Sequence, residues 1–413
     1  MSTLSLRNSA LYSSTIAHPN RGIISIGALY FLGSASSFVW SYMPRYFESL
    51  GWSGLMIGIF FAMKTVGQTA ATPFWAHWTD RKNSGRGFIQ IQHIIALFAA
   101  AMLPFISSQF AILALALIFG ITLRCSGPLI DAMAINRAGM TLYGKLRAWG
   151  AMGFGILAMA ATMAGLEVTH EDLAMLAPGL IVILLVGSAL VTAGLPSPGP
   201  RKQAPSQSFK DSFALLKRPA LVLLLPVSAV YFGAQAPYGL FLVSLAEERA
   251  FGAWVPSLAV GIGILGEILA FAMAHRLMRR IRPQRLLILA VIITALRLYL
   301  TGTVTDPGLF VGLQLLHGMS FAVFYMALVA ILTGETSDEN RNTGQALLYL
   351  IAFSIGGGLG TLISGIAFDL TTASKLFQYA GLLNVVLLPA LFVSLRIRST
   401  SPPRTHNRQS ANP

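Results

Sequence analysis

Long runs of apolar residues alternate with short polar segments along the whole chain. Each run holds about 18 to 25 residues with few charges, which at 1.5 Å per helical residue is enough to cross a hydrocarbon core of about 30 Å. We therefore expect an all-α polytopic membrane protein. The pattern predicts twelve membrane-spanning helices, near residues 23–44, 54–76, 88–106, 109–135, 147–166, 174–194, 220–244, 254–275, 286–303, 308–332, 344–366 and 376–395.

The composition agrees with this pattern and argues against a soluble enzyme. Of the 413 residues, 55% are hydrophobic and 11% are charged, whereas about 25% of residues are charged in a typical soluble domain. The seven histidines are scattered, without an H-E-x-x-H or similar arrangement. We expect no enzymatic activity, no metal site and no cofactor. Repeated rings of charge, which would indicate a channel, are not visible either.

The basic residues fall unevenly on the two sides of the predicted membrane. The chain has 29 Lys and Arg against 15 Asp and Glu, a net charge of +14. With twelve spans, 23 of the 29 fall in the termini and the loops after even-numbered spans, and three fall in the opposite loops. Because cationic residues are retained in cytoplasmic loops, both termini are predicted to be cytoplasmic. This distribution accounts for the net charge of +14, so we expect no nucleic acid as a partner. We expect a multi-pass protein of a bacterial inner membrane.

A proline-rich, basic segment divides the spans into two sets of six. The first ten residues of segment 196–219 contain four prolines, which prevent a continuous helix. We predict an N-terminal half over 1–195, this cytoplasmic linker, a C-terminal half over 220–398 and a cytoplasmic tail over 399–413. This layout resembles the major facilitator superfamily. The resemblance implies a solute site near the bilayer midplane between the halves.

The loop after the second span also resembles this superfamily. Residues 76–86 read AHWTDRKNSGR, which keeps the Asp-Arg pair and a downstream basic residue of the superfamily's G-x-x-x-D-R-x-G-R-R loop but lacks its leading glycine. We expect Asp80 to attract a helix end and Arg81 to latch across to other helices when the cytoplasmic side closes. The alternative is ordinary anchoring by cationic residues in a cytoplasmic loop.

Three ionisable residues of the C-terminal half are predicted to lie at similar depths in the membrane. A charge at the centre of a span costs at least about 2.5–3.5 kcal/mol on insertion scales, so such residues are functional candidates. Counted along the helices, Glu267 and His317 lie about 20 and 14 Å from the outer surface, and Arg297 about 16 Å from the inner one. We expect Glu267 and Arg297 to pair and, with His317, to form a proton relay. The alternative is an inert ion pair that holds two helices together.

The segments around these residues resemble lactose permease and its relatives. The likeness is carried by GE at 266–267, ALR at 295–297, LLH at 315–317 and YGKLRAWGAMGF at 143–154. It implies that the acid, arginine and histidine just named join substrate binding to proton transfer. It also implies that Arg147 contacts the substrate, that Phe154 stacks on a substrate ring, and that Asp131 on the fourth span pairs with Arg147.

The chain also departs from that family at the tenth span. The permease pattern K-x-x-H-x-x-E is replaced by Gln314, His317 and Ser320, so any proton coupling must centre on Glu267. Together with PLIDA at 128–132, the segments above look like the phenylpropionate permease branch of the superfamily, which is associated with aromatic carboxylates.

Polar and aromatic residues within the spans give an expectation for the solute. Lys64 and Gln68 share one face of the second span, Arg124 adds a cation on the fourth, and Tyr231 and Gln235 share a face of the seventh. Surplus positive charge beside aromatic side chains favours a small anion with an apolar body.

We therefore predict secondary active transport by alternating access, with symport of protons and a small organic solute. The solute that fits these residues best is an aromatic or other organic carboxylate. The alternatives are a sugar or nucleoside symporter and a transport-inactive sensor of the same fold. The expected partners are the solute, protons and the lipid bilayer, and no oligomer is required.

Overall fold

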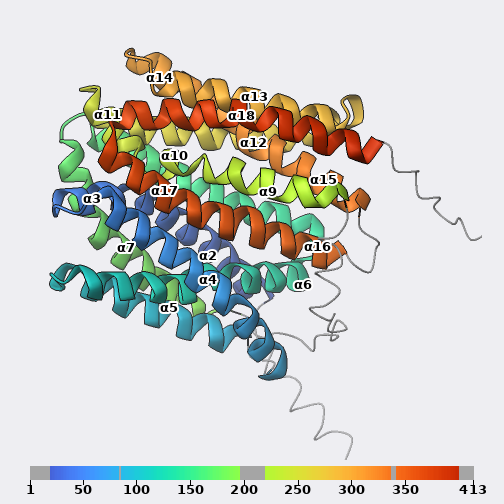
Figure 1. Ribbon diagram of the computed structural model, residues 1–413. Coiled ribbons are helices and arrows are strands. Elements are labelled where there is room, and N and C mark those ends of the chain that lie inside the picture. The colour runs from blue at the N-terminus through green and yellow to red at the C-terminus, as the bar shows by residue number, and fades with distance from the viewer. Residues whose placement is uncertain (1–18, 83–84, 196–218, 336–340, 400–413) are drawn as a thin grey trace, which may run out of the picture. The chain divides into compact units, whose positions relative to one another are not determined.

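The computed structural model describes residues 19–82, 85–195, 219–335 and 341–399, and these residues form helices and short loops without a strand (Figure 1). Within this part of the chain, 12 helical segments are long and apolar enough to cross a membrane. We number them spans 1 to 12 in chain order. Each overlaps one of the twelve predicted ranges, so the all-α polytopic fold is confirmed.

The first six spans are built from five long helices and three short ones. In chain order the elements are α2 (Pro19–Val39), a 3₁₀ turn (Trp40–Tyr42), α3 (Met43–Ser49), α4 (Gly54–Lys82), α5 (Gly85–Met102), a 3₁₀ turn (Leu103–Phe105), α6 (Gln109–Ala164) and α7 (His170–Thr192). The sequence predicts a break between spans 4 and 5, whereas α6 is helical through both. The segment between them contains neither proline nor a cluster of glycines that would end a helix.

The last six spans are more often interrupted. Their elements are α9 (Pro219–Gly233), α10 (Ala236–Leu240), α11 (Leu242–Glu248), α12 (Trp254–Arg280), α13 (Pro283–Thr301), α14 (Pro307–Leu313), a 3₁₀ turn (Gln314–Leu316), a π-helix (Met319–Val323), α15 (Phe324–Glu335), α16 (Arg341–Leu348), a second π-helix (Tyr349–Gly356), α17 (Gly357–Leu370) and α18 (Ala373–Ser399). Such π segments are rare and are frequently found at functional sites in proteins. Spans 7, 10 and 11 are therefore the irregular ones.

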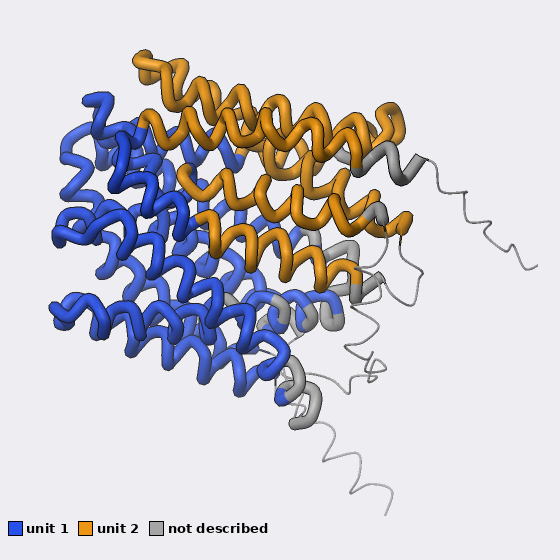
Figure 2. The backbone as a smooth tube through the Cα atoms, in the orientation of Figure 1, with its two compact units in different colours: residues 1–205, 238–264, 361–373 blue, residues 206–237, 265–360, 374–413 orange. Residues whose placement is uncertain are grey.

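The chain forms two compact units, which differ in colour in Figure 2. Unit 1 comprises residues 1–205, 238–264 and 361–373, and unit 2 comprises residues 206–237, 265–360 and 374–413. Unit 1 thus contains the first six spans together with one end each of spans 7, 8 and 11. The two units are defined by spatial contacts and are not continuous in the sequence. They therefore do not test the predicted halves 1–195 and 220–398, which stay a prediction.

Each unit has its own apolar core. In unit 1, α2 packs against α6 and α7, while α4 and α5 pack against α6. In unit 2, α13 packs against α15 and α9 packs against the second π-helix. The apolar side chains buried in the core of unit 2 include Phe324, Leu328, Ile331, Leu286, Leu287 and Leu391.

Candidate functional site

A buried arginine organises the polar interior of unit 2. Arg297 on α13 is completely buried. Its guanidinium donates from Nη1 to Gln314 Oε1 at 2.9 Å, from Nη2 to Gln235 Oε1 at 3.0 Å and from Nε to Ser320 Oγ at 3.1 Å. Gln235 lies at the break between α9 and α10, Gln314 in the 3₁₀ turn and Ser320 in the first π-helix. The interruptions of spans 7 and 10 therefore supply the acceptors of this guanidinium.

The partners of Arg297 are themselves held in place. Gln314 donates from Nε2 to Thr301 Oγ1 at 3.1 Å and to the Phe310 carbonyl at 3.0 Å. The buried hydroxyl of Tyr231 bonds to Thr294 and donates to the carbonyl of Ser320. Each member of such a network fixes the next, so the charge of the guanidinium is held in one position.

The expected acid and histidine lie beside this network within unit 2. His317 Nε2 is 2.9 Å from Glu267 Oε1, and their side chains are 13% and 19% exposed, respectively. Glu267 lies on α12, and His317 lies between the 3₁₀ turn and the π-helix of span 10. At 2.9 Å, a proton can pass directly between the carboxylate and the imidazole.

Two glycines allow α12 and span 10 to come this close. A Cβ atom at Gly318 would meet the carbonyl group of Gly266 and would lie 2.8 Å from the amide nitrogen of Glu267. Because Gly266 and Gly318 adjoin Glu267 and His317 in the sequence, this backbone contact sets the distance between the two titratable side chains.

This arrangement differs from the direct Glu267–Arg297 pair that the sequence suggests. The acid bonds to His317, and the bonds of Arg297 described above run to neutral oxygens. Gln314 and Ser320 occupy the positions where the lactose permease pattern has a lysine and a second carboxylate, and both accept a bond from Arg297. The two residues that differ from the permease pattern are thus residues that bind Arg297.

Unit 1 contains a second buried cation. Lys64 on α4 is 9% exposed, and its Nζ lies 3.3 Å from the centroid of the Trp40 indole and 5.7 Å from that of Phe61. An ammonium over the face of an indole is a favourable cation–π contact. Trp40 is held in turn by Phe60 and Phe119, whose ring centroids lie 6.2 and 5.0 Å away.

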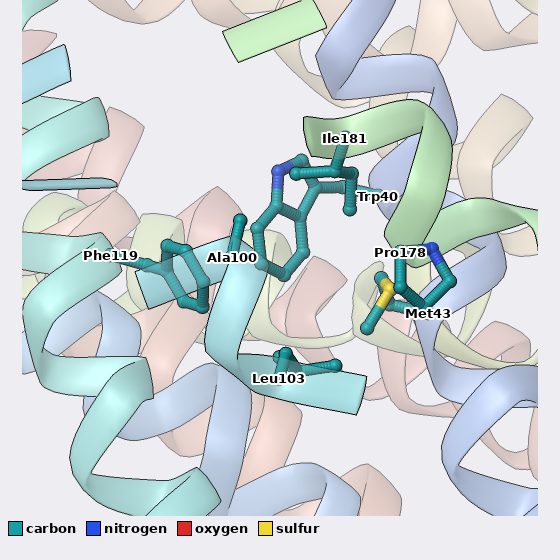
Figure 3. Close-up of a pocket in the computed structure, with 7 residues that line it drawn as sticks. All are labelled: Trp40, Met43, Ala100, Leu103, Phe119, Pro178 and Ile181. Carbon is teal, nitrogen blue, oxygen red and sulfur yellow. The ribbon is translucent and has the colours of Figure 1, made fainter. Parts of the chain in front are cut away.

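A small apolar hollow borders Trp40 (Figure 3). Its lining contains no charged side chain, and a polar solute would find no partner there. The hollow is therefore distinct in chemistry from the face of Trp40 that carries Lys64. Its lining residues are Trp40, Met43, Ala100, Leu103, Phe119, Pro178 and Ile181.

The structure brings Arg147 and Asp131 together, as the family resemblance implies. Arg147 Nη1 lies 3.4 Å from both carboxylate oxygens of Asp131 and 3.1 Å from the hydroxyl of Tyr143. Tyr30 on α2 donates to Asp131 Oδ1 at 2.5 Å. Phe154 lies two turns further along α6, edge-on to Phe38 with centroids 5.4 Å apart.

The other predicted residues have less informative surroundings. Gln68 is buried one turn from Lys64, and its carbonyl accepts a bond from Thr72 Oγ1 at 2.7 Å. Asp80 and Arg81 lie in α4, and Arg124 lies in α6, but their side chains lie outside the described part of the structure. The gating role of the first two and the cationic role of the third stay predictions.

A further polar cluster joins helix ends within unit 1, at the end predicted to lie outside. Arg45 on α3 contacts Glu247 on α11 through two bonds of 2.5 and 2.9 Å. One turn along each helix, Ser244 Oγ donates to Glu48 Oε1 at 2.6 Å. We call these four residues the outer cluster. It ties the end of span 1 to the end of span 7.

Spans 2 and 11 are tied at the same end of unit 1. The carboxylate of Asp369 on α17 accepts bonds from the amides of Gly54 and Leu55, at 2.6 and 2.8 Å. These amides open α4, and a carboxylate at a helix N-terminus is stabilised by the unsatisfied N–H groups and the helix dipole. Backbone and side chains therefore both link span ends at this end of the unit.

Comparison with known proteins identifies the family of the chain. The sequence model described as "MFS_1 like family" matches residues 23–379. The chain belongs to the MFS_1 like family. This MFS_1 like chain is thus a transporter of the major facilitator superfamily and a multi-pass inner-membrane protein.

Sequence relatives of this MFS_1 like chain are named for the transport of an aromatic acid and for multidrug resistance. It is 25% identical over 286 residues to "Probable 3-phenylpropionic acid transporter" of Escherichia coli (strain K12), across 65% of this chain and 70% of that protein. It is 26% identical over 391 residues to "Multidrug resistance protein MdtG" of Klebsiella pneumoniae (strain 342), across 89% of this chain and 90% of that protein.

Solved structures show the same fold. The crystal structure of the nucleoside transporter NupG has a TM-score of 0.77 at 21% identity, covering 91% of this chain and 99% of that one. A bacterial homologue of the human lysosomal transporter Spinster has a TM-score of 0.72 at 12% identity, covering 94% of this chain and 100% of that one. At these identities the likeness concerns the fold alone.

Several residues of this MFS_1 like chain were missed by sequence reasoning. Trp40 and Tyr30 look like ordinary apolar positions of span 1, because an aromatic residue on a membrane helix most often packs against neighbours. Arg45 and Glu247 look like loop charges. Asp369 lies one residue before the end of span 11 and beyond the range predicted for it, so it looks like a loop charge as well.

Proposed function

We propose that this MFS_1 like protein is a secondary transporter that carries a small organic carboxylate together with protons by alternating access. The observation that carries the proposal is the contact of His317 Nε2 with Glu267 Oε1 at 2.9 Å inside the spans. Two titratable groups in direct contact can share one proton. A protonated Glu267 donates to a neutral imidazole, and an ionised Glu267 accepts from Nε2–H.

The fixed charge of Arg297 supports a coupling role for this pair. A guanidinium stays protonated at all physiological pH values, so its charge does not change during a transport cycle. The interrupted span 10 carries both His317 and two of the acceptors of Arg297. A change in the protonation of Glu267 would act on the segment that holds the arginine, which gives a physical route from proton to conformation.

The carboxylate is favoured by the Lys64 site of unit 1. Its ammonium is almost buried and lies on an aromatic surface. A carboxylate with an apolar or aromatic body suits a site that presents a cation beside aromatic rings. The relative named for 3-phenylpropionic acid supports the same class.

Uptake into proteoliposomes tests the proposal. The solutes are 3-phenylpropionate, its neutral amide, a sugar and a nucleoside, each with and without an inward proton gradient. We expect accumulation of the acid above equilibrium only under the gradient, and little uptake of the amide. Accumulation of the sugar or nucleoside in preference to every acid would contradict the proposed solute.

A further inference from the structure

Five arginines crowd the turn between α12 and α13 in unit 2. Three lie in the last two turns of α12, one in the turn itself and one in the first turn of α13, and all five are exposed. The sequence has no acidic residue between Glu267 and Asp306. Among the described residues, none of the five forms an ion pair. The arginine turn, as we call it, consists of Arg276, Arg279, Arg280, Arg282 and Arg285.

The arginines of α12 continue a stripe of exposed apolar residues. Leu265, Ile268 and Leu269 are between 44% and 48% exposed and lie inside span 8. At about 100° per residue, the three arginines at the end of α12 fall within about 60° of the direction of Leu265. Glu267 points about 160° away, so the stripe is separate from the face that contacts His317.

The same alignment recurs on α13. Leu289, Ile292 and Leu296 are exposed within span 9. Their spacing from Arg285 is 4, 7 and 11 residues, which places all of them within about 40° of the direction of that arginine. Two helices therefore each carry an apolar stripe that ends in arginines at the same turn.

This alignment matches the two parts of a phospholipid. Exposed apolar side chains in a membrane span contact acyl chains, and residues just past the span end lie at the depth of the headgroups. Guanidinium groups bind phosphate oxygens through paired bonds and remain charged there. Clusters of four to eight basic residues beside a span are typical of anionic lipid recognition.

We propose that the arginine turn binds the phosphate of an anionic phospholipid whose acyl chains lie along the stripes of α12 and α13. A lipid satisfies both the charge and the apolar stripes, whereas a free anion would use the charge alone. The site lies on different faces from Glu267, so it is independent of the solute that the protein carries.

Native mass spectrometry of the purified full chain tests this site. The probes are cardiolipin and phosphatidylcholine with the same acyl chains, and inorganic phosphate alone. The first variant is Arg279→Gln/Arg280→Gln, and the second, Arg282→Gln/Arg285→Gln, tests the α13 side should the first fold poorly. The matched control, Arg86→Gln/Lys145→Gln, removes two charges elsewhere in the described chain.

We expect each arginine-turn variant to lose about 30-fold in cardiolipin affinity, which is about 2 kcal/mol at 1.4 kcal/mol per tenfold. The control should change less than about threefold, and phosphatidylcholine should bind weakly to all proteins. Raising the ionic strength should weaken cardiolipin binding to the wild type. Equal losses in control and variants, or unchanged binding in both arginine-turn variants, would overturn the site. Binding of inorganic phosphate as tightly as cardiolipin would overturn the lipid as its occupant.

Discussion

The backbone contact between Gly266 and Gly318 gives a perturbation that acts on the coupling pair without touching it. Alanine at position 318 would place a Cβ against the carbonyl of Gly266 and 2.8 Å from the amide nitrogen of Glu267. These atoms are backbone, so they cannot rotate away. Gly318→Ala must therefore push α12 and span 10 apart.

The size of the displacement follows from the contact distances. Ordinary van der Waals contact for a Cβ begins at 3.4 Å, so even the contact with the nitrogen of Glu267 must lengthen by 0.6 Å. This is the smallest of the required shifts, because the carbonyl group of Gly266 lies nearer to the added Cβ. Applied to the 2.9 Å contact between Glu267 and His317, it gives at least about 3.5 Å, outside the range of about 2.7–3.2 Å for N–H···O hydrogen bonds. Overpacking of this kind typically costs about 1–3 kcal/mol of stability.

The assay compares two modes of transport in proteoliposomes. We expect Gly318→Ala to lose proton-driven accumulation of the carboxylate while solute exchange without a gradient continues. The matched control is Gly312→Ala on the same span, where an added Cβ has no neighbour within 4 Å. Gly312→Ala should transport as the wild type does. Wild-type accumulation by Gly318→Ala would refute the reasoning, and so would an equal loss in Gly312→Ala.

Two further predictions concern unit 1. Ser257 on α12 is completely buried and bonds to the hydroxyl of Tyr42 at this end of unit 1, so a cysteine there, introduced after replacement of Cys125, reports on access from outside. Arg45→Glu and Glu247→Arg should each make this cysteine more reactive to a membrane-impermeant maleimide, and the double variant should restore protection. Lasting reactivity in the double variant would show that the pair does not protect this end. Trp40→Leu should weaken carboxylate binding by about 3- to 30-fold, since a cation–π contact is worth about 0.5–2 kcal/mol, whereas Trp40→Phe should keep most of it. Wild-type binding by Trp40→Leu, with Lys64→Met as the fully weakened reference, would show that the indole does not contribute to the site.

The spans could be predicted from the sequence because membrane insertion depends on local composition. A run of about 20 apolar residues has one stable arrangement in a bilayer, a helix, whatever its neighbours do. All twelve were found in this way. The break in span 7 and the 3₁₀ and π segments of spans 10 and 11 could not be predicted, because they depend on which helices pack alongside and not on local residue preferences.

The residues of the candidate site could be named more easily than their partners. Glu267, Arg297 and His317 stand out because charges are rare in membrane spans. That Glu267 contacts His317, and that Arg297 bonds to Gln235, Gln314 and Ser320, depends on the rotation of each helix, and a shift of one residue turns a helical side chain by about 100°. Trp40 gave no signal for the same reason, because nothing in its own segment shows that Lys64 lies above it.

Proton movement caused by the solute tests the central claim most directly. Proteoliposomes in weak buffer, without a gradient, receive 3-phenylpropionate while the external pH is recorded. We expect alkalinisation of the medium by the wild type, because protons enter with the acid. We expect none by Glu267→Gln, although that variant should still exchange labelled solute. Entry of the labelled acid into wild-type vesicles without any change in external pH, or an unchanged pH response in Glu267→Gln, would contradict it.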